Sequence, residues 1–293
     1  MPANGNGISA GQDGYAVIAP IPNHPEGNIC QMNKSGNNRF EDFFADDQYL
    51  ELKNYLYNYL LRKRAVQNQM KHEKAGVLLE IGSGISPLAD NHRNVIYTDL
   101  SFEAIHYLKK KNTSGYFVVA DGKHLPIKSH TCSHVICSEV LEHLDDDRPA
   151  IEEIHRILKN PGGKVMITFP HRRWYFAYDD RYVNHYRRYE IPEIKQKLQS
   201  AGLEPVVIRK VLGPMEKITM IPVAYIFSNI AKHRAGSRSV RVSKRRWLIG
   251  LVAPLFKWLN FLYMGLAWLD ARIMPQSLAA VILIESAVAA KKS

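Results

Sequence analysis

The stretch that decides the fold is LEIGSG, residues 79–84, which closes the longer apolar run VLLEIGSG. An apolar run of this length is typical of a buried strand, and two glycines separated by one residue let the backbone turn tightly against a bulky ligand. Glu80 stands beside these glycines, so the expected ligand presents hydrogen-bond donors or positive charge rather than phosphate alone. The stretch therefore predicts a strand, a turn and a binding site at the turn.

Further strands and helices alternate along the chain after this stretch. Proline in the first turn and Gly202 just past the end bound one of the helices, residues 192–201. The alternation predicts an α/β fold with a parallel sheet covered on both faces. Ligands of such sheets bind at the carboxyl ends of the strands. The remaining segments are strands at 77–81, 94–98, 116–120, 134–138, 164–169 and 204–210, with helices after Ser101 and at 150–158.

Three signals fall at those carboxyl ends. They are the EIGSG turn, Asp99 after the second strand and Asp121 after the third. A carboxylate in the position of Asp99 is the usual partner of ribose hydroxyls. The third glycine of GxGxxG is missing, and a pyrophosphate would be repelled by these carboxylates. The pattern favours a ligand with an adenosine and a positive centre.

A series of motifs carries a family resemblance over roughly residues 40–210. The motifs are EIGSG, YTDLS, ADGKHLP, CSEVLEHL and ILKNPGGKVMITFPH. Together they resemble the class I S-adenosylmethionine-dependent methyltransferases, in particular the small-molecule and lipid methyltransferases of types 11 and 12 with an LEH motif. The resemblance implies a doubly wound, Rossmann-like, mainly parallel sheet of seven strands, and S-adenosylmethionine as the cofactor of an enzyme.

The resemblance also implies the cofactor contacts. Gly82 and Gly84 would pass beneath the amino-acid part, with Glu80 oriented towards its ammonium through water or backbone. Asp99 would accept from the ribose and Asp121 from the adenine. The full expected set is Glu80, Gly82, Ser83, Gly84, Asp99, Leu100, Asp121, Gly122, Ser138 and Glu139. This chain departs from the family in carrying Cys132-Ser133 where Phe-Asp is common, and in a short segment 85–98 with room for only one or two helical turns.

The candidate catalytic residues are histidines that follow the fourth and fifth strands or lie in VNHYRRYE. Methyl transfer to a hydroxyl requires alignment of the nucleophile with the methyl group and removal of a proton. His143, His185 and His171 are the candidates for this chemistry, and Tyr189 is expected on the substrate side. Arg187 and Arg188 are expected either to line the pocket or to pair with surface carboxylates.

SEVLEH also resembles the metal site of ubiquinone-biosynthesis and small-RNA O-methyltransferases. Carboxylate and imidazole ligands could hold a divalent ion such as Mg²⁺ that lowers the pKa of a substrate hydroxyl. The expected ligands are Glu139, Glu142, His143 and His185. The alternatives without a metal are that His143 acts as the base or that it positions the substrate.

The end of the chain departs from the family pattern. The last two strands of this fold form a hairpin, and LAAVILIESA at 278–287 has the character of the seventh strand. Residues 211–277 are then an insertion, with two apolar stretches around the basic connector KHRAGSRSVRVSKRR. The domains are a disordered tail at 1–38, the methyltransferase core at 39–210, the insertion, and the last strand and tail at 278–293.

The composition of the insertion favours a membrane-surface element, with a helical lid as the alternative. A basic connector between tryptophan-containing apolar helices suits an anionic lipid surface. A single crossing of the bilayer would separate the seventh strand from its sheet, so spanning is not expected. The net charge of +11 favours anionic partners in general.

These observations predict a methyltransferase that acts on an amphiphilic, lipid-like or small-molecule acceptor, at oxygen. Three cysteines without a CxxC pair, and no signal-peptide pattern at the start, predict a cytoplasmic protein, peripheral on the inner face of the membrane. The alternatives are a soluble quinone or natural-product O-methyltransferase, an RNA methyltransferase, and a non-catalytic cofactor-binding module. The basic residues lie between apolar helices rather than with exposed aromatics, which disfavours nucleic acid.

Overall fold

The computed structural model describes residues 54–71, 73, 76–90, 92, 94–111, 114–235 and 242–289, with the side chains of 226–253, 255 and 256 excepted. The predicted tail at 1–38, Cys30 and the side chains of the basic connector at 232–246 lie outside this description.

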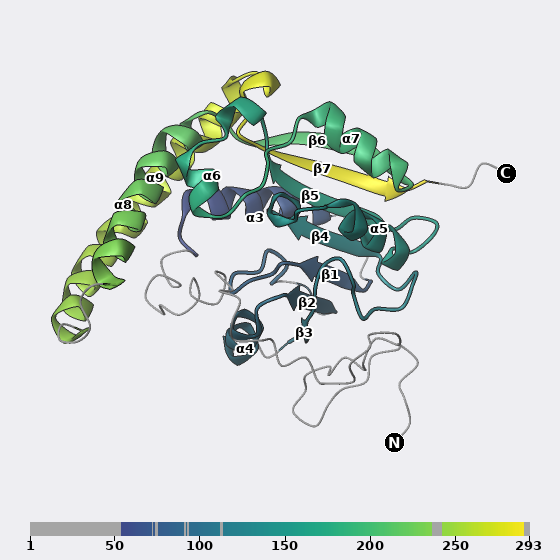
Figure 1. Ribbon diagram of the computed structural model, residues 1–293, viewed down its shortest axis with the longest axis horizontal. Helices are drawn as coiled ribbons and strands as arrows, with labels where there is room; N and C mark the ends of the chain where they lie inside the picture. The colour runs from purple at the N-terminus through teal and green to yellow at the C-terminus, as the bar shows by residue number, and fades with distance from the viewer. Residues whose placement is uncertain are drawn as a thin grey trace.

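A seven-stranded sheet forms the centre of the molecule, in the order β3-β2-β1-β4-β5-β7-β6 (Figure 1). All pairs from β3 to β5 are parallel, whereas β7 runs antiparallel to both β5 and β6. The α/β fold class with a mainly parallel, seven-stranded sheet is thereby confirmed. The strands are β1 (Leu78–Ile81), β2 (Val95–Asp99), β3 (Tyr116–Val119), β4 (His134–Ser138), β5 (Lys164–Pro170), β6 (Leu203–Leu212) and β7 (Val281–Val288).

Helices cover both faces of the sheet, as continuous burial along β1 requires. Successive side chains alternate between two cores, with Leu79 packed in one and Leu78 in the other. The first core includes side chains of α5 (Arg148–Ile157) and α7 (Ile191–Ser200). The second includes side chains of α3 (Tyr57–Met70) and α4 (Phe102–Lys111).

The expected helix between β1 and β2 is absent from the described residues of that segment, which form turns and bends instead. The other predicted segments occur within a few residues of their expected bounds. Short elements follow β4 and β5 near the carboxyl edge. They are η1 (Leu141–His143), η2 (Arg173–Tyr175) and α6 (Tyr178–Tyr182).

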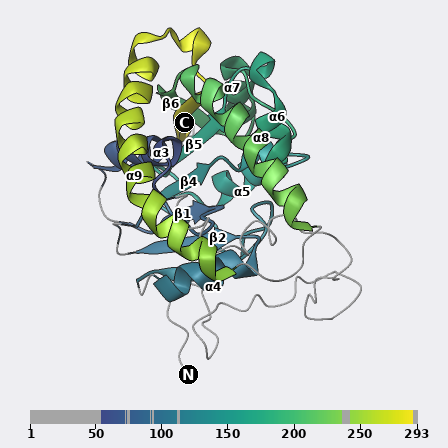
Figure 2. The ribbon, with the colours of Figure 1, turned by 90° about the vertical axis from the view of Figure 1, so that its left-hand side faces the viewer.

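Between β6 and β7 the chain forms two long helices, α8 (Met215–Ala235) and α9 (Val242–Ile273), followed by η3 (Gln276–Leu278). We call α8 and α9 the helical hairpin. Figures 1 and 2 show it standing over the carboxyl ends of the parallel strands, with α9 beside α3 and α8 beside α6. No described helix is both long and apolar enough to cross a membrane.

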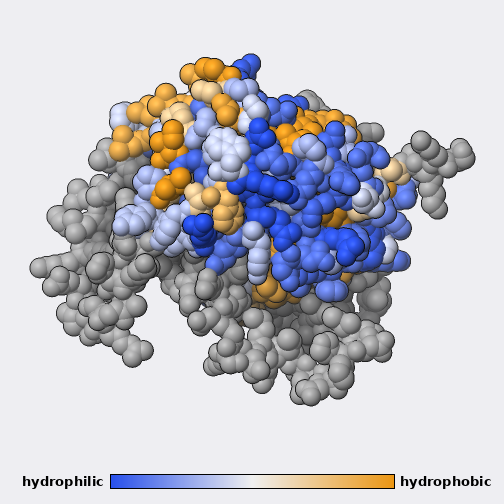
Figure 3. All heavy atoms as spheres, turned by 45° about the horizontal axis from the view of Figure 1, so that its top comes forward, coloured by the Kyte–Doolittle hydropathy of each residue, from blue (hydrophilic) through white to orange (hydrophobic). Residues whose placement is uncertain are grey.

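Large apolar side chains are exposed on the described part of the hairpin. Trp258 is 60% exposed and Phe261 is 64% exposed, on α9, and Ile218 on α8 is 71% exposed. Figure 3 shows apolar side chains gathered at the upper left of the molecule, while much of the rest of that face is hydrophilic. Further exposed members are Tyr225, Leu259, Leu262, Leu266, Trp268, Leu269 and Ile273.

Candidate functional site

The turn after β1 is held against the end of β2. Gly82 and Gly84 adopt positive φ angles of 67° and 53°. The Gly84 N–H donates to Oδ2 of Asp99 at 2.8 Å, and the Ser101 N–H donates to Oδ1 at 2.9 Å. A Cβ atom on Gly82 would lie 2.4 Å from Cγ2 of Val140, in the loop after β4. Only glycine fits at position 82. The turn after β1 is thereby packed against the end of β2 and the loop after β4.

The Glu80 carboxylate, expected to be oriented towards the cofactor ammonium through water or backbone, contacts the backbone of the segment after the glycine turn. Its carboxylate is buried and accepts the backbone N–H groups of Leu88 and Ala89, at 2.8 and 3.1 Å. Burial raises the pKa of Glu80 to about 7, although these two hydrogen bonds act to lower it. Glu80 therefore braces the irregular segment that replaces the expected helix between β1 and β2.

The other expected cofactor residues line the same edge of the sheet. Asp121 is exposed after β3 and accepts the Lys123 N–H at 2.9 Å, with Gly122 next to it. Leu100, after β2, is 48% exposed. Ser83 is buried, and its hydroxyl has no hydrogen-bond partner. We call Gly82, Ser83, Gly84, Asp99, Leu100, Asp121, Gly122 and Ser138 the strand-end cradle.

β4 delivers Ser138 and Glu139 to this edge. The hydroxyls of Ser138 and Thr168 lie 2.7 Å apart. Glu139 has a positive φ of 54°, which is unusual for a residue with a side chain. Its carboxylate accepts the Thr168 hydroxyl at 3.3 Å and lies 3.8 Å from the Arg62 guanidinium of α3. Glu139 thus turns towards β5 and α3.

Three of the four expected metal ligands come together. One ligand atom from each of Glu142, His143 and His185 lies within 4.8 Å of the other two, and we call these residues the acceptor cluster. Glu139 is not a member. The Tyr186 N–H donates to the Glu142 carbonyl at 2.8 Å, which fixes the His185 loop against η1.

Glu142 is the most unusual group of the cluster. It is fully buried, and neither carboxylate oxygen accepts a hydrogen bond. Burial, and then the charge of Glu139, raise the pKa of Glu142 well above its ordinary value. A buried carboxylate without partners costs stability unless it is protonated or receives a donor or cation. Glu142 therefore has the capacity to bind a donor, a proton or a cation brought by a ligand.

Two residues expected at the pocket serve the core instead. His171 is buried, with Nδ1 2.9 Å from the Ala279 carbonyl and Nε2 3.8 Å from Glu190, so it joins the end of β5 to the start of β7. Tyr189 is completely buried, and its hydroxyl donates to Asp147 at 2.5 Å. Both side chains follow a strand or loop at the correct edge but point to the interior.

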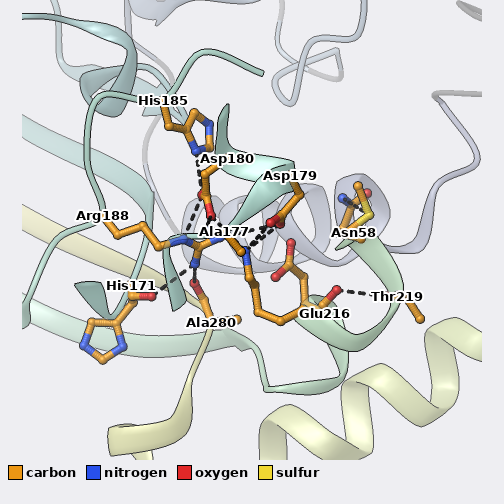
Figure 4. Close-up of polar contacts among 12 residues, drawn as sticks. Asn58, His171, Ala177, Asp179, Asp180, His185, Arg188, Glu216, Thr219 and Ala280 are labelled. Carbon is orange, nitrogen blue, oxygen red and sulfur yellow. Dashed lines mark hydrogen bonds and ion pairs between the residues drawn. The ribbon is translucent and has the colours of Figure 1, made fainter. Parts of the chain in front are cut away.

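Sequence reasoning missed a cluster of buried charges, Asp179, Asp180, Arg188 and Lys217, which we call the buried ionic cluster (Figure 4). Asp180 accepts Nε of Arg188 at 2.8 Å and Nζ of Lys217 at 2.9 Å. Lys217 also donates to both oxygens of Asp179. The pair Arg187 and Arg188 was the sequence signal for this cluster, but the partners of Arg188 lie in other elements. Arg188 proves to be a buried residue rather than a surface one.

Comparisons with known proteins agree with this architecture. Residues 79–167 match the family model described as a methyltransferase domain. A Mycolicibacterium smegmatis protein described as a "probable S-adenosylmethionine-dependent methyltransferase" is 28% identical over 50% of this chain and 60% of its own length. Demethylmenaquinone methyltransferase of Streptomyces griseus is 29% identical over 36% of this chain and 48% of its own length. The chain spans about half the length of the curated relatives that it matches.

A solved structure extends the likeness across the fold. The SAM-dependent methyltransferase from Thermotoga maritima superposes with a TM-score of 0.53, at 16% identity, over 85% of this chain and 99% of its own. The sheet order, the glycine turn and the carboxylates at the strand ends define a Rossmann-like cofactor domain. Residues 79–167 thus form a methyltransferase domain, and the chain is similar to S-adenosylmethionine-dependent methyltransferases in sequence and in fold.

Proposed function

We propose that the protein binds S-adenosylmethionine in the strand-end cradle and transfers its methyl group to an amphiphilic acceptor, at oxygen. The observation that carries this proposal is the meeting of the Gly82–Gly84 turn, Asp99 and the acceptor cluster at one edge of the sheet. The cofactor supplies an electrophilic methyl group on a positively charged sulfur. The carboxylates at the strand ends suit a positively charged adenosine derivative.

The chain's own part in the reaction is to hold the acceptor and to remove its proton. His185 and His143 are the candidate bases, since their rings lie 4.6 Å apart beside Glu142. In its neutral form, a histidine has one nitrogen that can accept a proton from a hydroxyl. Glu142, when protonated, can donate to an acceptor oxygen. His171 is not proposed as a base, because it is buried away from this cluster.

Calorimetric titration of the full chain with S-adenosylmethionine tests the cofactor part. We expect binding by the wild type and weakening by Asp99→Ala of about tenfold to 150-fold, because a hydrogen bond to a charged group contributes about 1.5–3 kcal/mol. Asp146→Ala, which removes an exposed carboxylate after η1, is the matched control and should bind as the wild type does. A folded wild-type protein that binds no S-adenosylmethionine would refute the proposal.

The amphiphilic nature of the acceptor is proposed from the helical hairpin. The hairpin stands over the carboxyl ends of the parallel strands, the edge at which the acceptor cluster lies (Figure 2), and it carries exposed apolar side chains. The basic stretch 232–246, which runs from the end of α8 into the start of α9, supplies Arg238, Arg241, Lys244, Arg245 and Arg246. Each basic residue near an anionic lipid surface contributes about 1 kcal/mol, so we propose reversible docking of the hairpin on such a surface.

Flotation with vesicles of stated composition tests the docking. We expect the protein to float with vesicles that contain phosphatidylglycerol but not with pure phosphatidylcholine, and binding to weaken as salt screens the charges. Replacement of the five basic residues by glutamine should abolish flotation. Absence of binding to anionic vesicles would instead favour a hairpin that acts as a lid over a soluble acceptor.

A metal-assisted reaction is a second candidate, favoured by the orphaned carboxylate of Glu142 beside two histidines. One carboxylate and two imidazoles form a plausible ligand set for a divalent ion. Such an ion would lower the pKa of a bound hydroxyl. Calorimetry with Mg²⁺ or Mn²⁺ alone should then show binding that Glu142→Gln removes. If neither ion gives a heat of binding, the metal-assisted reaction is refuted and the reaction without a metal remains.

A further inference from the structure

Asp180 is the feature that the proposed reaction does not yet use. It lies on α6, is 1% exposed, and faces His185 of the acceptor cluster in the close-up (Figure 4). Its Oδ1 is 3.0 Å from Nδ1 of His185, and the His185 N–H also donates to the Asp180 carbonyl at 2.9 Å. Both backbone and side chain of one residue therefore hold this histidine.

We propose that Asp180 is a positioning residue, which fixes His185 as the tautomer with its proton on Nδ1. A carboxylate can only accept, so a bond at 3.0 Å requires that Nδ1 carries hydrogen. In neutral His185 this leaves the lone pair on Nε2, the nitrogen 3.8 Å from Glu142. That nitrogen then faces the acceptor cluster as the group able to take a proton or bind a cation.

Asp180 can perform this role because its own charge and position are fixed. Burial alone would raise the pKa of Asp180, but the His185 hydrogen bond and the charge of Arg188 outweigh it and hold the pKa well below its ordinary value. Arg188 donates to the same oxygen as His185, while Lys217 and the Ala177 N–H donate to the other. Lys217 belongs to α8, so the base of the helical hairpin takes part in orienting His185.

This inference rests on the proposed role of His185, but its test needs neither cofactor nor acceptor. Full-length protein labelled with ¹⁵N-histidine is examined by long-range ¹H–¹⁵N correlation spectra at a pH where His185 is neutral, and His185→Gln assigns its signals. We expect Nδ1 to be the protonated nitrogen in the wild type. In Asp180→Ala the proton should shift to Nε2 in at least half of the molecules, because the partner that holds it on Nδ1 is lost.

Asp179→Ala is the matched control. Asp179 is the adjacent carboxylate on α6 and shares Lys217, but its described contacts do not include His185. It should leave the His185 tautomer unchanged, whereas a general disturbance of the buried ionic cluster would alter it in both variants. The proposal is overturned if wild-type His185 carries its proton on Nε2, or if Asp180→Ala leaves the spectrum unchanged. The wild-type spectrum decides the matter even if a variant fails to fold.

Discussion

Gly82 shows how a single missing side chain shapes the cofactor edge. Its positive φ and its approach to Val140 are both incompatible with a larger residue, so this position couples the turn after β1 to the loop after β4. Glu142 and His143 follow Val140 by two and three residues, in η1. The packing of one glycine thus positions both the cradle and the acceptor cluster.

We expect Gly82→Ala to destabilise the protein through this contact. The left-handed conformation costs an L-residue about 1–2 kcal/mol, and overpacking adds about 1–3 kcal/mol. Val140→Ala removes the close atom, so the double variant should be more stable than the sum of the two single losses predicts. Urea unfolding measures all three variants. Strict additivity would show that the clash with Val140 is not the cause.

Glu216, in the first turn of α8, gives the protein a predictable pH dependence. It is buried with one oxygen unpartnered, and burial raises its pKa to about 7. The folded state therefore holds this proton more tightly than the unfolded state, and its stabilising effect disappears as the pH rises through 7. The amide of Glu216→Gln does not ionise, so this variant does not lose that part of its free energy of unfolding as the pH rises. The variant should gain roughly 3 kcal/mol relative to wild type between pH 4.5 and pH 8.

Chemical unfolding of both proteins across this pH range measures the difference. Glu152→Gln, at an exposed position on α5, is the control and should show no such gain. A constant difference between Glu216→Gln and wild type would mean that Glu216 has an ordinary pKa in the folded protein.

At the scale of elements, the junction of α6 with α8 is the feature that joins the insertion to the sheet domain. Lys217 is buried and donates to Asp179 and Asp180, which lie in a helix of only five residues. Tyr57 of α3 and Thr219 of α8 add a hydroxyl contact of 2.5 Å next to it. The hairpin is therefore anchored at its base by polar contacts rather than by apolar packing alone.

Lys217→Met should be strongly destabilising, because it leaves two buried carboxylates without their shared cation. Breaking such a buried pair costs about 3–5 kcal/mol. Lys123→Met removes a comparable ion pair, with Asp145, that lies at the surface, and its unfolding midpoint should equal that of the wild type. If Lys217→Met unfolds at the wild-type midpoint in guanidinium, the junction does not depend on this lysine.

The order of elements was predictable from sequence because it depends on local patterns. Apolar runs, Gly202 and the acidic strand ends identified the strands and their binding edge. The direction of a side chain at a strand end was not predictable. Glu80, His171 and Tyr189 all occur at the correct edge, but each points inward to a backbone or buried partner. The pairing of Asp180 with Lys217 joins residues 37 positions apart, which no local pattern reveals.

At the scale of the whole molecule, the helical hairpin and the proposed site lie on the same side, at the carboxyl ends of the parallel strands. The described part of α9 carries Trp258 and Phe261, both more than half exposed, and α9 stands before the carboxyl ends of the strands in Figure 2. Exposed apolar side chains gathered in this way are typical of an interaction site. This placement would present an acceptor from a lipid surface directly to the cluster.

The double variant Trp258→Ser and Phe261→Ser should lose vesicle binding without loss of stability. Burial of each aromatic side chain contributes about 1.5–3 kcal/mol, so the partition constant should fall at least tenfold. The melting temperature should remain that of the wild type, because both side chains are exposed in the free protein. Val206→Ser, at an exposed apolar position on β6, is the control. Undiminished vesicle binding by the double variant would exclude this face from the docking surface.

The position of β7 between β5 and β6 has a consequence for the synthesis of the chain. β7 is the only partner of β6 among the described strands and also borders β5, yet the 68 residues 213–280 separate it from the end of β6. At about 5–20 residues per second, the ribosome needs several seconds to produce them. During that interval the edges of β5 and β6 stay open, and α8 and α9 are completed before β7 is translated. The apolar hairpin is thus available to a membrane or a chaperone before the sheet that it serves can close.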